Sequence, residues 1–234
     1  MTWSFARSVA GAIGFLPIFL AAWPSSAQHA KSFADDAPVV ALIRFLAEQG
    51  DPEAQNRLGD IFSEGRGAAK DYSQALLWYQ KAADQGFAPA EFSLAVAYFS
   101  GQGAPQDNRA AVTWYRKAAE QGYADAEANL ASLYEHGWGV SQNFWEAANW
   151  YRKAADQGDA SSQFSLAQLY AKGLGVKHDD VLAYMWLAIA ASDAPKTDGT
   201  RELALRYKDD LAKRLSSAEI MQAQDMAKRW KKDK

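Results

Sequence analysis

The chain has 234 residues, of which 49% are hydrophobic and 13% aromatic, and it contains no cysteine. This composition is too apolar for an intrinsically disordered protein, and the lack of cysteine excludes disulfide frameworks, thiolate metal sites and cysteine nucleophiles. The formal net charge of -3 also lacks the basic excess that is typical of proteins that bind duplex nucleic acid.

The first 27 residues have the order of a secretory signal peptide. Arg7 precedes an apolar run from Val9 to Trp23, and small residues follow at Ser25 and Ala27. The run has about 15 residues, whereas a membrane-spanning helix needs about 20 apolar residues. We therefore expect cleavage after Ala27, with an uncleaved membrane anchor as the alternative. The mature protein is expected in a bacterial periplasm or outside the cell.

Residues 28–51 are expected to form a linker and one helix, from about Pro38 to Gln49. This helix ends in Gln-Gly, as several later helices do. Asp51 and Pro52 then supply a helix cap and a first-turn proline for the next helix. The lone helix is expected to cover the N-terminal end of the fold that follows.

Residues 52–193 contain four ungapped copies of one 36-residue unit. The phrase Trp-Tyr-x-Lys-Ala-Ala-x-Gln-Gly starts at Trp78, Trp114 and Trp150. A fixed period of this length indicates a stack of equivalent structural units. The other repeated columns are a leucine (Leu58, Leu94, Leu130, Leu166), an aromatic residue (Phe62, Tyr98, Tyr134, Tyr170), a glycine pair (first Gly65, Gly101, Gly137, Gly173) and a cap (Asp71, Asp107, Asn143, Asp179).

These columns predict a unit of helix, short glycine-rich loop and helix. The leucine and the aromatic residue share one face of the first helix, a glycine ends it, and Asp or Asn caps the second helix. The tryptophans are interpreted as core residues, with an exposed platform for sugars or bases as the alternative. Because one helix pair cannot bury its own apolar face, the units must stack. The predicted fold is all-α, a right-handed α/α superhelical solenoid.

The pattern Ala-x-x-x-Leu, Tyr or Phe, Gly-x-Gly, Asp or Asn, and Ala-x-x-Trp-Tyr-x-Lys-Ala-Ala-x-Gln-Gly resembles the Sel-1-like repeat, a relative of the tetratricopeptide repeat. Repeat four departs from it, with Leu187, Ile189 and Ala194 in place of the tyrosine, the lysine and the last glycine. The resemblance implies an exported bacterial scaffold that binds other proteins.

Residues 194–234 are expected to form two capping helices, at about residues 201–215 and 217–230, and a basic tail. Ser216 and Glu219 form a capping box between the helices. The tail, Lys-Arg-Trp-Lys-Lys-Asp-Lys, suits a helix C-terminus, and peripheral contact with an anionic membrane is the alternative.

No catalytic, cofactor-binding or metal-ligating residues are predicted. The three histidines, His29, His136 and His178, have no partner at ligand spacing, and no Walker, zincin or nucleophile-elbow motif occurs. Some secreted relatives are linked to β-lactams, but the chain has no Ser-x-x-Lys motif. A cell-wall or β-lactam hydrolase and a glycan- or peptidoglycan-binding module remain the alternatives to a scaffold.

The first helices of such stacks line a concave surface, which is where the resemblance places a protein or peptide partner from the cell envelope. Residues within the corresponding columns differ from repeat to repeat, as a tailored binding surface would, and Phe92, Val96 and Phe99 offer it an apolar pocket. In the alternative interpretation these aromatic residues pack on the preceding helix. The candidate contact residues are Asn56, Asp60, Glu64, Phe92, Val96, Phe99, Ser132, His136, Phe164, Gln168 and Lys172.

Overall fold

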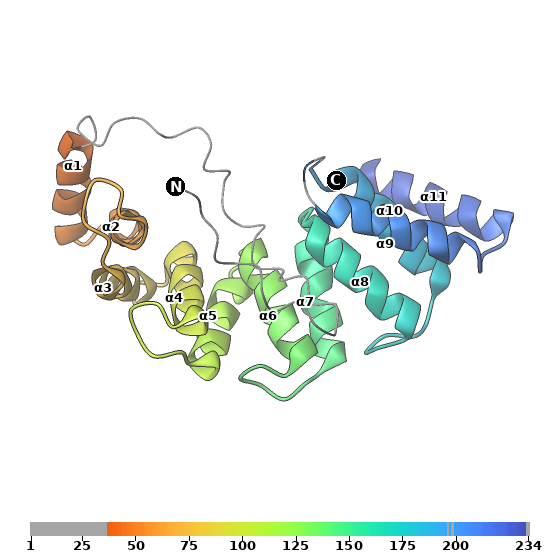
Figure 1. The fold of residues 1–234 in the computed structure, drawn as a ribbon, viewed down its shortest axis with the longest axis horizontal. Helices are drawn as coiled ribbons and strands as arrows, with labels where there is room; N and C mark the ends of the chain where they lie inside the picture. The colour runs from red at the N-terminus through yellow and green to blue at the C-terminus, as the bar shows by residue number, and fades with distance from the viewer. Residues whose placement is uncertain (1–36, 196, 198, 233–234) are drawn as a thin grey trace, which may run out of the picture.

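The computed structural model describes residues 37–195, 197 and 199–232, and these form eleven α-helices. The predicted signal segment and most of the predicted linker lie outside the described residues. Figure 1 shows the helices following one another along a curved arc, with α1 at one end and α11 at the other. The helices are α1 (Ala37–Glu48), α2 (Pro52–Glu64), α3 (Tyr72–Ala83), α4 (Ala88–Ser100), α5 (Asn108–Glu120), α6 (Ala124–His136), α7 (Phe144–Asp156), α8 (Ala160–Lys172), α9 (Asp180–Asp193), α10 (Gly199–Ala212) and α11 (Ser217–Lys232).

Each 36-residue unit forms one pair of helices, with α2, α4, α6 and α8 as the first helices and α3, α5, α7 and α9 as the second. Every helix from α1 to α9 packs on its neighbours in the chain. The all-α stack of helix pairs that the repeat predicted is therefore confirmed.

The two glycines of each loop are required by its geometry. Gly101 ends α4 with a left-handed backbone (φ 72°), and its N–H donates to the carbonyl of Ala97. Gly139, in the loop after α6, also has a positive φ of 73°. A Cβ atom on Gly139 would lie 2.3 Å from the carbonyl oxygen of Asn108 in α5. In repeats two to four the second glycine thus lets the loop touch the start of the preceding repeat's second helix, whereas Gly67 of repeat one lies against Val40 of α1.

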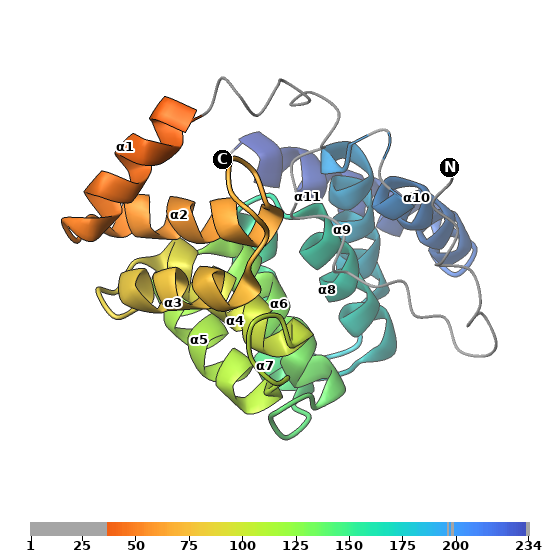
Figure 2. The same ribbon diagram turned by 60° about the vertical axis from the view of Figure 1, so that its left-hand side comes forward.

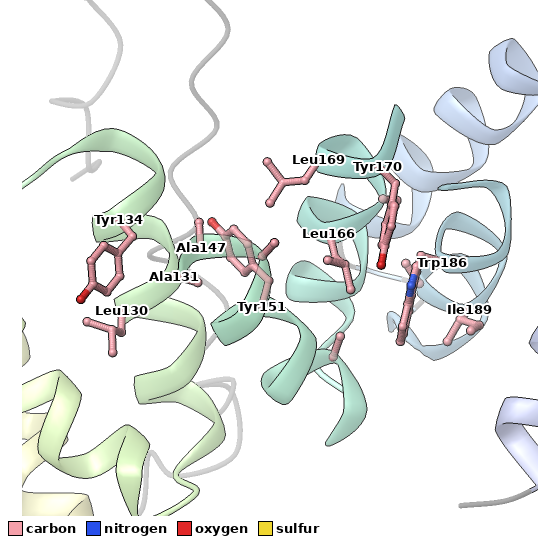
Figure 3. Close-up of a cluster of buried hydrophobic side chains, with 14 of the residues drawn as sticks. Leu130, Ala131, Tyr134, Ala147, Tyr151, Leu166, Leu169, Tyr170, Trp186 and Ile189 are labelled. Carbon is pink, nitrogen blue, oxygen red and sulfur yellow. The ribbon is translucent and has the colours of Figure 1, made fainter. Parts of the chain in front are cut away.

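The interior of the stack is built on the leucine column and on a tyrosine column (Figure 3). Each of the four leucines has 0% exposure. The tyrosines Tyr79, Tyr115 and Tyr151 have 6%, 0% and 1% exposure. Alanines on both helices leave room for these rings, so the side chains of successive repeats pack closely.

The repeat tryptophans pack against the core as predicted, but three of the four are only partly buried. Trp78, Trp114 and Trp150 are half-buried, and the lysine three residues later lies 4.0, 3.9 and 3.8 Å from each ring centroid. Successive residues of a helix point about 100° apart, so the tryptophan and the following tyrosine cannot both face the same neighbouring helix. The tyrosine is the buried residue of the two.

The C-terminal helices cover the last repeat (Figure 2). Both α10 and α11 pack on α9. Trp230 of α11 lies edge-on to Trp186, with ring centroids 5.5 Å apart, and donates a hydrogen bond to Asp156 (3.2 Å). Trp186 is therefore the buried tryptophan of the column, at 3% exposure. The capping box at Ser216 is confirmed, since its N–H donates to Glu219 at 2.7 Å.

The N-terminal helix α1 packs on α2 but has an apolar outer side. Val39, Leu42 and Phe45 are more than half exposed, at 56%, 57% and 58%. A terminal helix that ends a stack normally presents a polar outer side to solvent. The helix predicted to cover the N-terminal end therefore does so with an apolar surface outward.

Candidate partner-binding surface

Phe92, Val96 and Phe99 lie on one side of α4, because they are spaced by four and three residues. All three are half-buried and pack against the main hydrophobic cluster. The Phe92 ring lies 5.2 Å from the ring of Tyr123, just before α6, and the Phe99 ring lies 5.9 Å from the ring of Trp138, just after α6. We call these five residues the aromatic strip.

Beneath the strip lies Tyr115, whose hydroxyl is buried without a hydrogen-bond partner. Its ring is 5.7 Å from that of Phe92, and the residue has 0% exposure. Burial raises the pKa of Tyr115, and no neighbouring charge contributes to the shift. The hydroxyl is thus an isolated polar group in the core of repeat two.

The same tyrosine has partners in repeats one and three. The Tyr79 hydroxyl donates to Asp60 at 2.8 Å and lies 3.1 Å from the hydroxyl of Ser63. The Tyr151 hydroxyl donates to Glu135 at 2.7 Å. The positions of Asp60 and Ser63 are occupied in repeat two by residues of the strip, Val96 and Phe99, which offer no acceptor.

Repeat two therefore has an apolar strip where its neighbours have hydrogen-bonding groups. An unsatisfied buried hydroxyl destabilises a fold by about 1–3 kcal/mol. Such groups are rare in native proteins and call for a specific explanation. At the aromatic strip the chain accordingly departs from the arrangement that satisfies the core tyrosine in repeats one and three.

The charges of three carboxylates act on Tyr123, at one end of the strip, or on one another. The ordinary pKa of Tyr123 is raised by burial and, next, by the charges of Asp125 and Asp60. Burial also raises the pKa of Asp125, and the nearby Asp159 adds to this shift. We call Asp60, Asp125 and Asp159 the acidic group. Asp60 belongs to repeat one and Tyr123 to the end of repeat two, so the charge of Asp60 acts across a repeat boundary.

Most of the predicted contact residues are at least partly accessible. Lys172 is exposed at the end of α8, and one residue, Ser132, is buried at 4% exposure. The prediction of Ser132 as a contact residue is therefore wrong, because its hydroxyl lies within the core beside Tyr151. The half-buried predicted residues are Asn56, Asp60, Glu64, Phe92, Val96, Phe99, His136, Phe164 and Gln168.

Phe164 occupies in repeat four the position of Phe92 in repeat two, but its neighbour comes from outside the repeats. Its ring lies 5.3 Å from the ring of Tyr207 in α10, in an edge-on arrangement. The chain's own C-terminal region thus contacts this phenylalanine.

His136 stacks on Trp138 at the other end of the strip. The two ring centroids are 4.6 Å apart, and Nδ1 of His136 lies 2.9 Å from the carbonyl oxygen of Ser132. His178 instead lies 3.1 Å from Asp180, at the start of α9. Over the part of the chain that the structure describes, no three metal-ligating side chains come together.

Sequence reasoning missed a hydrogen bond that recurs in every repeat. A buried Gln or Glu of the first helix meets a side chain thirty residues later, at the end of the second helix. The pairs are Gln55 with Gln85 (2.8 Å), Glu91 with Gln121 (2.7 Å), Glu127 with Gln157 (2.8 Å) and Gln163 with Asp193 (3.1 Å). The recurrent Gln-Gly was interpreted only as a helix end, although the matching Gln or Glu column was visible in the sequence.

A shallow polar recess lies between residues 106–109 and the loop at 137–141. The carboxylate of Asp107 in this recess caps α5 by accepting from Arg109 and Ala110. The recess therefore arises where the loop after α6 meets the start of α5, and its carboxylate is already used as the cap of that helix.

No helix in the described ranges has the length and apolar character needed to cross a membrane.

The sequence matches the family described as Sel1 repeat at residues 52–87, 88–123, 124–159 and 160–194. No curated protein sequence matches the chain.

Two solved structures resemble the chain in both sequence and fold. A Sel1 repeat protein from Oxalobacter formigenes is 34% identical, with a TM-score of 0.68, over 76% of this chain and 50% of that one. A protective antigen with an SLR fold from uropathogenic Escherichia coli is 30% identical, with a TM-score of 0.51, over 83% of this chain and 48% of that one. The chain thus spans about half the length of either protein.

Proposed function

This chain belongs to the Sel1 repeat family, whose members generally mediate protein–protein interactions, and we propose that it is an exported module that binds a protein partner at the aromatic strip. It acts by binding rather than by catalysis. The partner belongs to the cell envelope, for example a sensor or an assembly component, since the first 27 residues have the order of a signal peptide.

The observation that carries this proposal is the unpartnered hydroxyl of Tyr115. Replacing the acceptors found in repeat one by Val96 and Phe99 leaves that hydroxyl unsatisfied and places two apolar side chains at the surface. A row of apolar side chains that stays partly exposed at the expense of a core hydrogen bond supports a role in binding. The aromatic strip contains four aromatic rings, which supply large contact area with few rotatable bonds.

The repeat tryptophans are poorly suited to the alternative of a glycan platform. A stacking platform needs a free ring face, but a lysine ammonium group lies over Trp78, Trp114 and Trp150. These rings also pack against the hydrophobic clusters of the stack. Each is therefore engaged within the chain itself.

In-cell photo-crosslinking tests the location of the binding site. A photoreactive phenylalanine analogue would replace Tyr123 in the strip or, as the matched control, Trp145 in α7, an aromatic residue that is 60% exposed. We expect a discrete adduct with one envelope protein from position 123 and none from position 145. Adducts from position 145 alone would reject the strip as the binding surface.

The proposed export is tested by mapping the N-terminus of the protein recovered from its own cells. We expect the mature chain to begin at Gln28 and to be found in the envelope or medium. An intact N-terminus in the cytoplasm would contradict export.

A further inference from the structure

The first and second helices of the repeats differ in charge, which bears on the kind of partner that the strip accepts. The second helices carry five acidic residues (Glu120, Glu146, Asp156, Asp180, Asp193) and six basic ones (Lys81, Arg109, Arg116, Lys117, Arg152, Lys153). The first helices carry seven acidic residues (Glu53, Asp60, Glu64, Glu91, Asp125, Glu127, Glu135) and only two basic ones (Arg57, Lys172). The first helices are therefore strongly acidic.

Near the strip this acidic character is stronger still. Neither α4 nor α6, which carry or flank the strip, contains a lysine or arginine. The closest cations to Asp60 are Arg57 and Arg66, and each is paired with a different carboxylate, Glu53 and Glu64. The acidic group thus lies beside an apolar row with no cation from α4 or α6 to neutralise it.

We propose that the partner's docking segment inserts an apolar side chain at the aromatic strip and places a lysine or arginine beside the acidic group. This inference rests on the proposed function, and it names the chemistry of the segment. Opposite charge next to an apolar contact fixes the register of a bound segment and speeds its association. An acidic or neutral segment would bring no positive charge to Asp125 and Asp159, whose own helices at this point, α6 and the start of α8, offer no lysine or arginine beside them.

The test is selection from a displayed library of random 12-residue peptides on the purified protein. We expect the selected peptides to combine Leu, Ile, Phe or Trp with Lys or Arg. Their dissociation constants would then be measured for three variants whose folding is checked by circular dichroism. These are a strip variant, Phe92→Ala/Val96→Ser, which copies repeat three; its repeat-four counterpart, Phe164→Ala/Gln168→Ser; and an acid variant, Asp60→Asn/Asp125→Asn.

The strip variant should bind selected peptides about 30-fold more weakly, as expected for the loss of a binding hot spot. The repeat-four counterpart should bind them like the wild type. The acid variant should bind about fivefold to tenfold more weakly at low salt, and this difference should shrink at high salt.

Other outcomes separate the two proposals. Selected peptides that need the strip but carry no basic residue, or that bind the acid variant equally well, would overturn the inference and leave the proposed function in place. Peptides that bind all variants equally, or a selection that yields no binder, would overturn both. Self-association that depends on the basic residues at 228–234 and on the strip would identify a second copy as the occupant, and would overturn the inference.

Discussion

Repeats two and four carry phenylalanine at the same position of their first helix, yet the two rings have different surroundings. Phe92 continues into Val96 and Phe99, whereas Phe164 is followed at those positions by Gln168 and Ala171. The helix α8 of repeat four is contacted by α10 as well as by α9, whereas α4 packs mainly on α3 and α5. A column of the repeat therefore fixes where a residue lies in its unit, but the neighbouring elements decide what it can contact.

The two repeats also differ beneath the surface. Repeat four has Leu187 in place of the core tyrosine, so it has no hydroxyl to satisfy at this position. Repeat two keeps Tyr115 and lacks its acceptor. The half-exposed apolar row and the missing hydrogen bond thus occur together in repeat two.

The largest expected effect concerns the core, where the repeats should be equivalent. Leu130→Ala in α6 and Leu166→Ala in α8 remove side chains that are fully buried. Each should lower the free energy of unfolding by about 3–4 kcal/mol, because the lost side chain leaves a cavity. Urea denaturation would measure both. If one of these two losses were less than about half of the other, the cores of the two repeats would not be equivalent.

The next largest effect should come from removing the contact between α10 and Phe164 of repeat four. Tyr207→Ala removes the ring that lies edge-on to Phe164. We expect a loss of about 1–2 kcal/mol, from the aromatic pair and its buried area, in thermal or urea unfolding. An unchanged stability would mean that α10 does not hold Phe164, and the contrast between the two phenylalanines would then fail.

Removing the hydroxyl of the core tyrosine should affect stability differently in different repeats. Tyr79→Phe and Tyr151→Phe each delete a hydrogen bond to a carboxylate and should lower stability by about 1–2 kcal/mol. Tyr115→Phe deletes a hydroxyl with no partner and should leave stability unchanged or slightly higher. Equal losses for all three variants would show that the Tyr115 hydroxyl is satisfied in solution.

The smallest effect is a pH dependence from the recurrent hydrogen bond. Burial raises the pKa of Glu91 and of Glu127, so the folded state holds these protons more tightly than the unfolded state does. Their contribution to stability is therefore greatest at low pH and is lost as pH rises through the raised pKa values.

Repeats one and four have glutamine at this position, and in both it also donates to a carbonyl oxygen of the preceding helix. Glu91→Gln and Glu127→Gln should each raise stability by about 1 kcal/mol at pH 7. Thermal unfolding at pH 7 and pH 4 should show this gain shrinking at the lower pH. A stability gain that grows as the pH falls would contradict the raised pKa values of Glu91 and Glu127.

The fold could be predicted from the sequence because the same structural columns recur in four copies of the repeat. The leucine column, the helix caps and the paired glycines each correspond to one structural role, and each role is local to a unit. The helix phase was harder to predict, because the adjacent Trp78 and Tyr79 are both aromatic and only packing decides which one turns inward. The burial of Ser132 was missed for the same reason.

Features that depend on distant parts of the chain could not be predicted from the repeat. Tyr207 lies outside the repeated columns, so its contact with Phe164 has no periodic signal. The unpartnered hydroxyl of Tyr115 depends on which residues of α4 turn toward α5, and the charges that act on Tyr123 come from two different repeats. These determine the candidate site, whereas the repeat determines the scaffold.

The most direct test of the central claim compares the strip variant, Phe92→Ala/Val96→Ser, with its repeat-four counterpart, Phe164→Ala/Gln168→Ser. Crosslinking from position 123 would be repeated in both backgrounds once circular dichroism shows that each is folded. We predict that the strip variant loses the partner adduct and that the repeat-four variant retains it. Retention of the adduct by the strip variant, or its loss in both, would contradict the assignment of partner binding to repeat two.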